Sequence, residues 1–382
     1  MQKNIPFNKP YMTGKELFYI SQAHFNGCLA GDGPFTKKSH LWLEESISCK
    51  KALLTHSCTA ALEMSALLLD LSEGDEVIMP SYTFVSTANA FVLRGAKPVF
   101  VDIREDTLNI DENLIAEAIT SKTKAIVPVH YAGVSCEMDT IMELANLNGL
   151  SVVEDAAQGI GASYKGRPLG SIGSMGTLSF HETKNVISGE GGALLVNDEN
   201  LIESAEIIRE KGTDRSRFMQ GLVDKYTWRS EGSSFLPGEL TAAFLFAQLI
   251  EERTITSKRL SMWEFYHENI KCYEDSGFLR RPYVPLGCEH NAHMYYILLD
   301  SSKMRDKVLA FMTEQGIGVV FHYVPLHSSP AGEAFGASSG ALDKTNDLSS
   351  RLLRLPLWIG LSEEDQRRVI EVLGEALTSA HK

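Results

Sequence analysis

The segment Ser151-Val152-Val153-Glu154-Asp155 is a short apolar run that ends in two carboxylates, a pattern typical of a β-strand. Similar runs recur over residues 50–200, and helix-length segments separate several of them. The runs occupy residues 52–55, 76–80, 98–102, 125–129, 176–180 and 192–196, with helical patterns over 60–71, 85–94 and 139–147. This alternation predicts an α/β domain with a mostly parallel sheet. Ligands of such sheets bind beyond the carboxyl ends of the strands.

A second, smaller unit is expected after a helix-rich stretch that runs from about residue 239 to 275. Residues 294–299 and 319–323 have strand-like patterns, and residues 305–315 between them have a helical one. We therefore predict a large domain over residues 1–250 and a smaller C-terminal α/β domain over residues 251–382.

The composition argues against several classes of partner. The 382 residues carry a formal net charge of −13, and 44% of them are hydrophobic, as expected for a globular protein with a core. A chain of this charge repels phosphate backbones and anionic lipids, so we expect no nucleic-acid and no membrane partner. The chain starts without an apolar signal segment, and its six cysteines form no C-x-x-C pair. We expect a cytoplasmic protein without a disulfide framework or a metal site.

Residues 55–62 follow a strand-like run and begin a helix with small hydroxylated side chains. Backbone N–H groups at Ser57, Cys58 and Thr59, together with the helix dipole, make this junction suitable for a phosphate. The alternative is an ordinary serine or threonine N-cap that binds no ligand.

Two ionisable residues stand near the ends of other strands. Asp155 could pair with a protonated pyridine nitrogen, although a strand-end acid is often only a solvated surface group. Lys184 follows the apolar run that contains Ser179, and the glycines within residues 189–192 let the backbone pass close to a ligand. A lysine held where its amine can deprotonate forms Schiff bases with aldehydes, and Ser179 could offer its hydroxyl to a phosphate.

An aromatic side chain beyond the run at 76–80 could stack on a flat ring. Tyr82 and Phe84 are the candidates, and either could instead belong to the core. Pyridoxal phosphate accounts for all four features, because it has an aldehyde, a phosphate, a flat ring and a basic nitrogen. The competing nucleotide-binding fold lacks support, because neither a G-x-G-x-x-G nor a phosphate-loop motif is present.

These motifs occur together in a specific order and spacing. The segments Glu154-Asp155-Ala156-Ala157-Gln158, Ser179-Phe180-His181, Lys184-Asn185 and Gly189-Glu190-Gly191-Gly192 resemble the nucleotide-sugar aminotransferases of the DegT/DnrJ/EryC1/StrS family. The resemblance continues through nearly the whole chain. It implies an aspartate-aminotransferase-like fold, type I of the pyridoxal-phosphate transferases, whose large domain binds the cofactor.

The resemblance also implies a role for each residue of the cofactor site. Lys184 would bind the cofactor covalently, Asp155 would meet the pyridine nitrogen and Gln158 the ring hydroxyl. Phe84 rather than Tyr82 would stack on the ring. The phosphate would be held by Ser179 and by backbone groups at Ser57, Cys58 and Thr59.

The family resembled here forms homodimers with shared active sites, in which a G-x-N-x-[RK] segment of one subunit reaches the phosphate in the other. The matching segment is Gly232-Ser233-Ser234-Phe235-Leu236. Ser234 replaces the asparagine and could still donate a hydrogen bond, whereas Leu236 replaces the basic residue and supplies no charge. The resemblance therefore implies a homodimer in which Ser234 is the candidate contact across the interface.

The implied reaction moves an amino group from L-glutamate to C4 of dTDP-4-dehydro-6-deoxy-D-glucose, which gives dTDP-4-amino-4,6-dideoxy-D-galactose. Such a product serves a surface polysaccharide of the O-antigen or enterobacterial common antigen type. A histidine is more often structural than functional, but several polar residues are candidates to contact the dTDP-sugar. They are His181, Lys225, Arg229, His322 and His327.

Several alternatives accompany this interpretation. The amine could be delivered with gluco stereochemistry or at C3, because the cofactor residues are the same in each case. A nucleotide-sugar-binding regulatory protein could keep the fold, but loss of Asp155 or Lys184 would then be expected, and both are present. Family members with histidine at the lysine position do not transaminate by this route, and Lys184 argues against that class.

Overall fold

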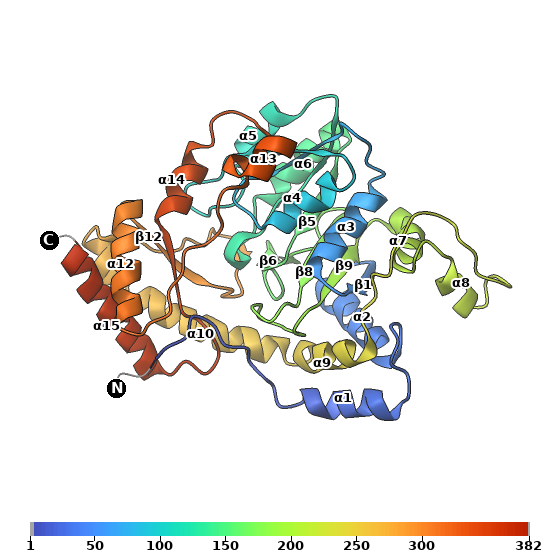
Figure 1. Cartoon of the computed structure of the whole chain (residues 1–382), viewed down its shortest axis with the longest axis horizontal. Helices are drawn as coiled ribbons and strands as arrows, with labels where there is room; N and C mark the ends of the chain where they lie inside the picture. Colours follow the sequence, from blue (N-terminus) through green and yellow to red (C-terminus); the bar gives the residue numbers. More distant parts are fainter. Residues whose placement is uncertain (1–3, 381–382) are drawn as a thin grey trace.

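The computed structural model describes residues 4–380, and its main feature is a twisted sheet covered by helices (Figure 1). The strands of this sheet are β1 (Lys51–Thr55), β2 (Glu76–Pro80), β3 (Lys97–Val101), β4 (Thr123–Ile126), β5 (Ser151–Asp155), β8 (Met175–Ser179), β9 (Gly192–Val196) and β13 (Ala337–Ser338). Their order is β1-β9-β8-β5-β4-β2-β3-β13, and β9 runs antiparallel to both of its neighbours while the other pairs are parallel. The predicted α/β fold with a mostly parallel sheet is confirmed.

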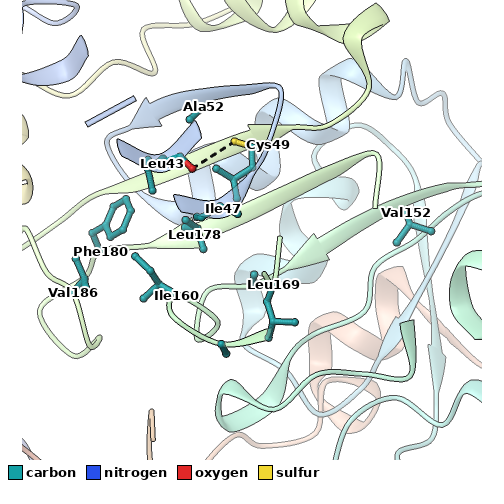
Figure 2. Close-up of a cluster of buried hydrophobic side chains, with 14 of the residues drawn as sticks. Leu43, Ile47, Cys49, Ala52, Val152, Ile160, Leu169, Leu178, Phe180 and Val186 are labelled. Carbon is teal, nitrogen blue, oxygen red and sulfur yellow. Dashed lines mark hydrogen bonds between the residues drawn. The ribbon is translucent and has the colours of Figure 1, made fainter. Parts of the chain in front are cut away.

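The two faces of the large sheet pack against different helices. These helices are α1 (Glu16–Phe25), α2 (Pro34–Ile47), α3 (Cys58–Leu68), α4 (Val85–Val92), α5 (Glu112–Ala118), α6 (Met138–Asn148), α7 (Ile202–Arg209) and α9 (Glu239–Leu249). Because side chains alternate along a strand, Leu54 and Leu178 join a core with α2, α6 and α9, whereas Leu53 and Val153 join one with α3 and α7. Figure 2 shows part of the first core, to which Leu43 of α2 and Leu178 of β8 both belong.

The C-terminal part of the chain builds a second core. Its antiparallel sheet consists of β10 (Leu279–Arg280), β12 (Tyr295–Leu299) and β14 (Leu352–Leu355). The accompanying helices are α10 (Glu252–Asn269), α11 (Lys271–Asp275), α12 (Ser302–Glu314), α13 (Pro330–Phe335), α14 (Asp343–Arg351) and α15 (Glu363–Ala380). Helix α10 places Ile255 in the core of the large sheet and Trp263 in the second core, so it links the two. The boundary between residues 250 and 251 stays a prediction, and β13 extends the large sheet from the C-terminal side.

The strand predicted over residues 319–323 is wrong. Val320 forms an isolated bridge to Arg354, with backbone N···O distances of 3.3 and 2.8 Å, and the pairing goes no further. Beyond it, the His322 ring is hydrogen-bonded to Tyr131 and the Tyr323 hydroxyl accepts a hydrogen bond from Gln158. These contacts draw the segment toward the large sheet, so tertiary packing overrides its strand pattern.

A long arm leaves the body of the molecule after α7 and carries α8 (Arg215–Met219), at the right of Figure 1. A small third sheet joins β6 (Ser163–Tyr164), β7 (Arg167–Pro168) and β11 (Cys288–Glu289), and this sheet lies beside α6. Over residues 4–380, no helix combines the length and the apolar character that crossing a membrane requires.

Candidate active site

A cavity of about 830 Å³ lies at the edge of the large sheet where β1, β2, β5 and β8 end. Parallel strands end at the same edge, so residues far apart in the sequence meet there. The cavity collects ten of the residues singled out from the sequence. They are Ser57, Cys58, Thr59, Phe84, Asp155, Gln158, Ser179, His181, Lys184 and His322.

Lys184 lies in the loop between β8 and β9, and backbone hydrogen bonds fix this loop. Phe180 N–H donates to Gly191 O at 2.8 Å, and Lys184 N–H donates to His181 O at 2.9 Å. Burial lowers the pKa of the Lys184 amine, the charge of Arg354 acts in the same direction, and Cys58 and Asp155 oppose the shift. The site therefore shifts this amine toward its neutral, nucleophilic form.

Asp155 ends β5 with its carboxylate held from two sides. One oxygen accepts a hydrogen bond from the Thr87 hydroxyl at 2.7 Å, and the other accepts one from Ala157 N–H at 3.1 Å. The side chain is buried, and no lysine, arginine or histidine within residues 4–380 forms an ion pair with it. A buried carboxylate without a basic partner is suited to a cationic group on a ligand.

The start of α3 has a serine N-cap, and whether it also binds a phosphate stays a prediction. Ser57 is the N-cap, and its hydroxyl accepts a hydrogen bond from Ala60 N–H at 3.1 Å. The N–H groups of Cys58 and Thr59 belong to the first turn, which has no intrahelical acceptors for them. Gly192 packs against this turn so closely that a Cβ there would lie 2.4 Å from Cys58 N. Ser179 lines the same part of the cavity.

The structure separates the two aromatic candidates. Tyr82 is 1% exposed and its hydroxyl lies 3.3 Å from that of Tyr131 inside a core, whereas Phe84 is 56% exposed and lines the cavity. Phe84 immediately precedes α4, and its ring centroid lies 6.2 Å from that of Tyr323, another residue of the cavity. A stacking role therefore has geometric support for Phe84 and none for Tyr82.

Gln158 uses its side chain to join three segments. Its Oε1 accepts a hydrogen bond from Ala132 N–H at 2.7 Å, and its Nε2 donates to the Tyr323 hydroxyl at 2.9 Å. Ala132 has a φ of 59°, an uncommon conformation for a residue with a Cβ, and the bond to Gln158 helps to hold it. The second N–H of Nε2 is the group that a cofactor hydroxyl could use.

Four predicted residues do not line the cavity of a single chain. Ser234, Lys225 and Arg229 are exposed on the arm, where Arg229 forms an ion pair with Asp214 at 3.6 Å. His327 does not line the cavity, and its Nδ1 lies 2.7 Å from the Ser81 hydroxyl. Their roles toward substrate or cofactor stay predictions.

The cavity also contains residues that the sequence did not reveal. They are Thr87, Arg259, His293, Tyr323 and Arg354. Arg354 interrupts the otherwise apolar run of β14, and this interruption was a usable signal. Thr87 and His293 carry no such signal, because only the folded chain brings them beside Asp155 and Lys184.

The chain belongs to the DegT/DnrJ/EryC1/StrS aminotransferase family, whose sequence model matches residues 10–374. It is 33% identical to the spore coat polysaccharide biosynthesis protein SpsC of Bacillus subtilis strain 168, over 98% of each chain. The aminotransferase TlmJ from Streptoalloteichus hindustanus is 29% identical with a TM-score of 0.91, over 99% of this chain and 100% of that one. Spr1654 from Streptococcus pneumoniae, described as a sugar aminotransferase and solved in its PLP form, is 25% identical with a TM-score of 0.89, over 99% of this chain and 100% of that one.

The protein is therefore an aminotransferase that depends on pyridoxal phosphate, and the residues present fit this cofactor. The donor set contains a lysine with a lowered pKa, a buried carboxylate without a basic partner and a helix N-terminus with free N–H groups. The half-exposed ring of Phe84 completes the set. Each of these groups matches one part of the cofactor: the aldehyde, the ring nitrogen, the phosphate and the ring face.

Proposed function

We propose that this enzyme transfers the amino group of L-glutamate to C4 of dTDP-4-dehydro-6-deoxy-D-glucose, giving 2-oxoglutarate and dTDP-4-amino-4,6-dideoxy-D-galactose. The observation that carries an amino-transfer function is Lys184, which shares one cavity with Asp155 and has a lowered pKa. The similarity to a polysaccharide biosynthesis protein and to a sugar aminotransferase supports a sugar as acceptor. The dTDP group, the C4 position and the galacto product come from the sequence resemblance.

In this proposal Lys184 anchors the cofactor, Asp155 pairs with its ring nitrogen, and Phe84 covers the ring. The phosphate lies at the start of α3 with Ser57, Cys58 and Thr59, and Ser179 adds a hydroxyl. When bound, pyridoxal phosphate supplies an electron sink that stabilises a carbanion next to the transferred nitrogen. Lys184 then moves the proton at the reacting carbon, first as base and then as acid, and its lowered pKa favours this exchange.

The acceptor sugar is proposed to contact His181 and His322. Both residues line the cavity that also contains Lys184. Burial and the charges of Arg354 and Lys184 hold the pKa of His322 well below its usual range. His322 is therefore neutral near pH 7 and acts as a hydrogen-bonding group rather than as a cation. His181 lies nearer the surface, with its ring 2.9 Å from the Thr183 hydroxyl.

A homodimer with shared active sites is the second part of the proposal. Large apolar side chains are exposed on the arm: Met219 (72%), Leu222 (62%), Tyr226 (51%) and Trp228 (83%). Such a surface favours contact with another chain. The partner subunit would bring Ser234, Lys225 and Arg229 of its own arm toward the cavity. Sedimentation of the active enzyme tests this part, and a fully active monomer contradicts it.

The protein is further proposed to work in the cytoplasm and to supply a surface polysaccharide. All six cysteines are free, as expected for a reducing compartment.

The deciding experiment incubates the holoenzyme with dTDP-4-dehydro-6-deoxy-D-glucose and L-glutamate and assigns the product by NMR. A small coupling between H3 and H4 indicates the axial amine of the galacto product. A large coupling indicates the gluco epimer and overturns the stereochemistry, and an amine at C3 overturns the position. Absence of any aminated sugar overturns the acceptor while the aminotransferase assignment stands.

A further inference from the structure

His293 stands just before β12, in a segment that is hydrogen-bonded to the Lys184 loop. Asn185, the residue after Lys184, reaches this segment with its side-chain amide: Nδ2 donates to Asn291 O at 2.8 Å, and Oδ1 lies 3.2 Å from His293 Nδ1. Asn291 is fully buried, and its own Nδ2 donates to Gln158 O at 2.7 Å. Buried hydrogen bonds therefore fix the His293 ring relative to the Lys184 loop.

The hydrogen bonds of Asn185 decide which nitrogen of the His293 ring carries a hydrogen. A backbone carbonyl only accepts, so the Asn185 atom that faces Asn291 O is the NH2 group, and the atom that faces His293 is the carbonyl oxygen. That oxygen also only accepts, so His293 Nδ1 must donate. In a neutral ring with its hydrogen on Nδ1, Nε2 has a free lone pair and is an acceptor.

The neighbours of His293 keep its ring neutral. Burial and the charges of Lys184, Arg259, His322 and Arg354 hold the pKa of His293 well below its usual range. Arg259 also donates from Nη2 to His293 O at 2.7 Å, which places a permanent cation beside this residue. A second hydrogen, on Nε2, is therefore disfavoured at neutral pH.

The Nε2 atom of His293 is left without a partner. Within residues 4–380 no backbone or side-chain group is hydrogen-bonded to it, and the half-buried ring lines the cavity that also contains Lys184. The Lys184 amine likewise has no hydrogen bond or ion pair in the described part of the chain. After burial, the charge of Lys184 is what acts most strongly on His293. A free acceptor and a free donor thus share one cavity.

We propose that Nε2 of His293 accepts a hydrogen bond from the amine of Lys184 while that amine carries the proton of the reacting carbon, which rests on the proposed role of Lys184 as base and then acid. The lone pair of the amine forms the new N–H bond as the C–H bond breaks, and the electron pair of that bond stays on the carbon, where the bound cofactor stabilises it. The same proton later returns to carbon, so His293 gains no proton and loses none.

The acceptor answers a conflict within the site. Burial favours the neutral form of Lys184, which can take up a proton, but it disfavours the ammonium form that results. A hydrogen bond from the ammonium group to a neutral imidazole lowers this penalty without adding a second charge. His293 is thereby a positioning residue that acts through Lys184.

Two substitutions separate this role from the bond to Asn185, because asparagine and glutamine amides reach the places of Nδ1 and Nε2 respectively. His293→Asn keeps a donor for Asn185 Oδ1 and removes the acceptor in the cavity, whereas His293→Gln does the reverse. The control is His290→Asn, the same change in the same segment. The His290 ring packs on Trp263, with centroids 4.4 Å apart, and does not line the cavity.

The first measurement uses the full-length protein without cofactor. The rate at which acetic anhydride acetylates Lys184 is followed against pH by peptide mass spectrometry, which gives the pKa of this amine. We expect His293→Asn to lower that pKa further, because the ammonium form loses its acceptor, whereas His293→Gln and His290→Asn should stay near the wild type. In the wild-type holoenzyme, nitrogen-15 NMR should show a hydrogen on Nδ1 of His293 and none on Nε2.

The second measurement follows the holoenzymes with L-glutamate alone, by the absorbance of the bound cofactor in stopped flow. His293→Asn should slow this half-reaction by about tenfold or more, because a hydrogen bond to a charged group is lost. Deuterium on the α-carbon of glutamate should slow this variant more than the wild type, since proton removal becomes more limiting. His293→Gln should lose about threefold or less.

An unchanged Lys184 pKa and a normal half-reaction in His293→Asn overturn the proposal. A loss confined to His293→Gln also overturns it, because His293 would then only hold Asn185, and so does a hydrogen found on Nε2. Thermal melts show whether each variant folds, and the NMR result decides if His293→Asn does not. If glutamate reacts with none of the proteins, the proposed donor fails while acetylation and NMR still decide the role of His293.

Discussion

The cavity has two walls that differ in origin and chemistry. The strand-end wall consists of residues 57–59, 155–158 and 179–184, which follow strands of the large sheet. The C-terminal wall consists of Arg259, His293, residues 320–323 and Arg354. The first wall carries the groups that suit a cofactor, and the second carries cations and neutral rings that suit a substrate. In the proposed function the cofactor groups come from the first wall, and the acceptor sugar contacts both walls through His181 and His322.

The electrostatics of the walls differ as well. On the strand-end wall Asp155 raises the pKa of Lys184, in opposition to burial, which lowers it. On the C-terminal wall burial holds the pKa values of His293 and His322 well below the usual range, and the charges of Lys184 and Arg354 add to this. Both histidines are neutral at pH 7, so the positive charge of this wall comes from Arg354 and Arg259.

The largest effect should come from Lys184→Ala on the strand-end wall. This variant should lose transamination by several orders of magnitude, because it removes both the covalent anchor and the proton carrier. In the wild type, borohydride reduction of the holoenzyme should label Lys184, as peptide mass spectrometry can show. Lys165→Ala, which removes an exposed lysine paired with Asp139, is the control and should retain full activity. Labelling at another lysine would break the assignment of this wall.

Asp155→Asn should have the next largest effect. The amide keeps the shape and the hydrogen bond from Thr87 but removes the charge, so kcat should fall by about 10²–10³-fold, as when another preorganised electrostatic partner is lost. Steady-state kinetics and a thermal melt measure the two consequences, and the fold should survive. Asp139→Asn, at an exposed acid, is the matched control. Near-normal turnover would mean that the ring nitrogen has another partner.

Tyr323→Phe probes the contact between the walls. It removes the hydroxyl that accepts a hydrogen bond from Gln158 at 2.9 Å, which contributes roughly 0.5–1.5 kcal/mol. We expect kcat/KM for the sugar to fall by about tenfold or less, with little change in the absorbance of the bound cofactor. Tyr283→Phe, at an exposed tyrosine, controls for loss of a hydroxyl. A loss as large as that of Asp155→Asn would show that the walls do not act separately.

The smallest effect concerns the stability of the cofactor-free protein. In the folded protein, burial lowers the pKa of Lys184 below its ordinary 10.5. At pH values between the folded-state pKa and 10.5, the unfolded state therefore binds more protons than the folded one. The contribution of Lys184 to the free energy of unfolding therefore rises with pH across this window. Lys184→Met removes this titration and should be the more stable protein at pH 7, with the difference closing toward pH 10.5. Urea unfolding at several pH values measures it, and a difference that grows with pH contradicts the assignment.

Sequence patterns predicted the strand-end wall well because each of its residues follows an apolar run. Asp155 and Ser179 end β5 and β8, and Ser57 precedes α3 by one residue, so local sequence alone places them at one edge of the sheet. The C-terminal wall was less predictable. Residues 319–323 look like a strand, yet only Val320 pairs with Arg354 of β14, and His322 and Tyr323 contact Tyr131 and Gln158 instead.

The sequence by itself determined the fold class and the cofactor, and it predicted Lys184 as the residue that binds it, because periodicity, strand-end position and motif order are local properties of the chain. The tertiary structure decided that Phe84 and not Tyr82 faces the cavity, that Thr87 donates to Asp155, and that Arg354 lies near Lys184. Burial and proximity depend on how distant segments pack. In the sequence, Lys184 and Arg354 are 170 positions apart. No local pattern encodes such a proximity; it arises where the C-terminal part of the chain and the strand ends of the large sheet line one cavity.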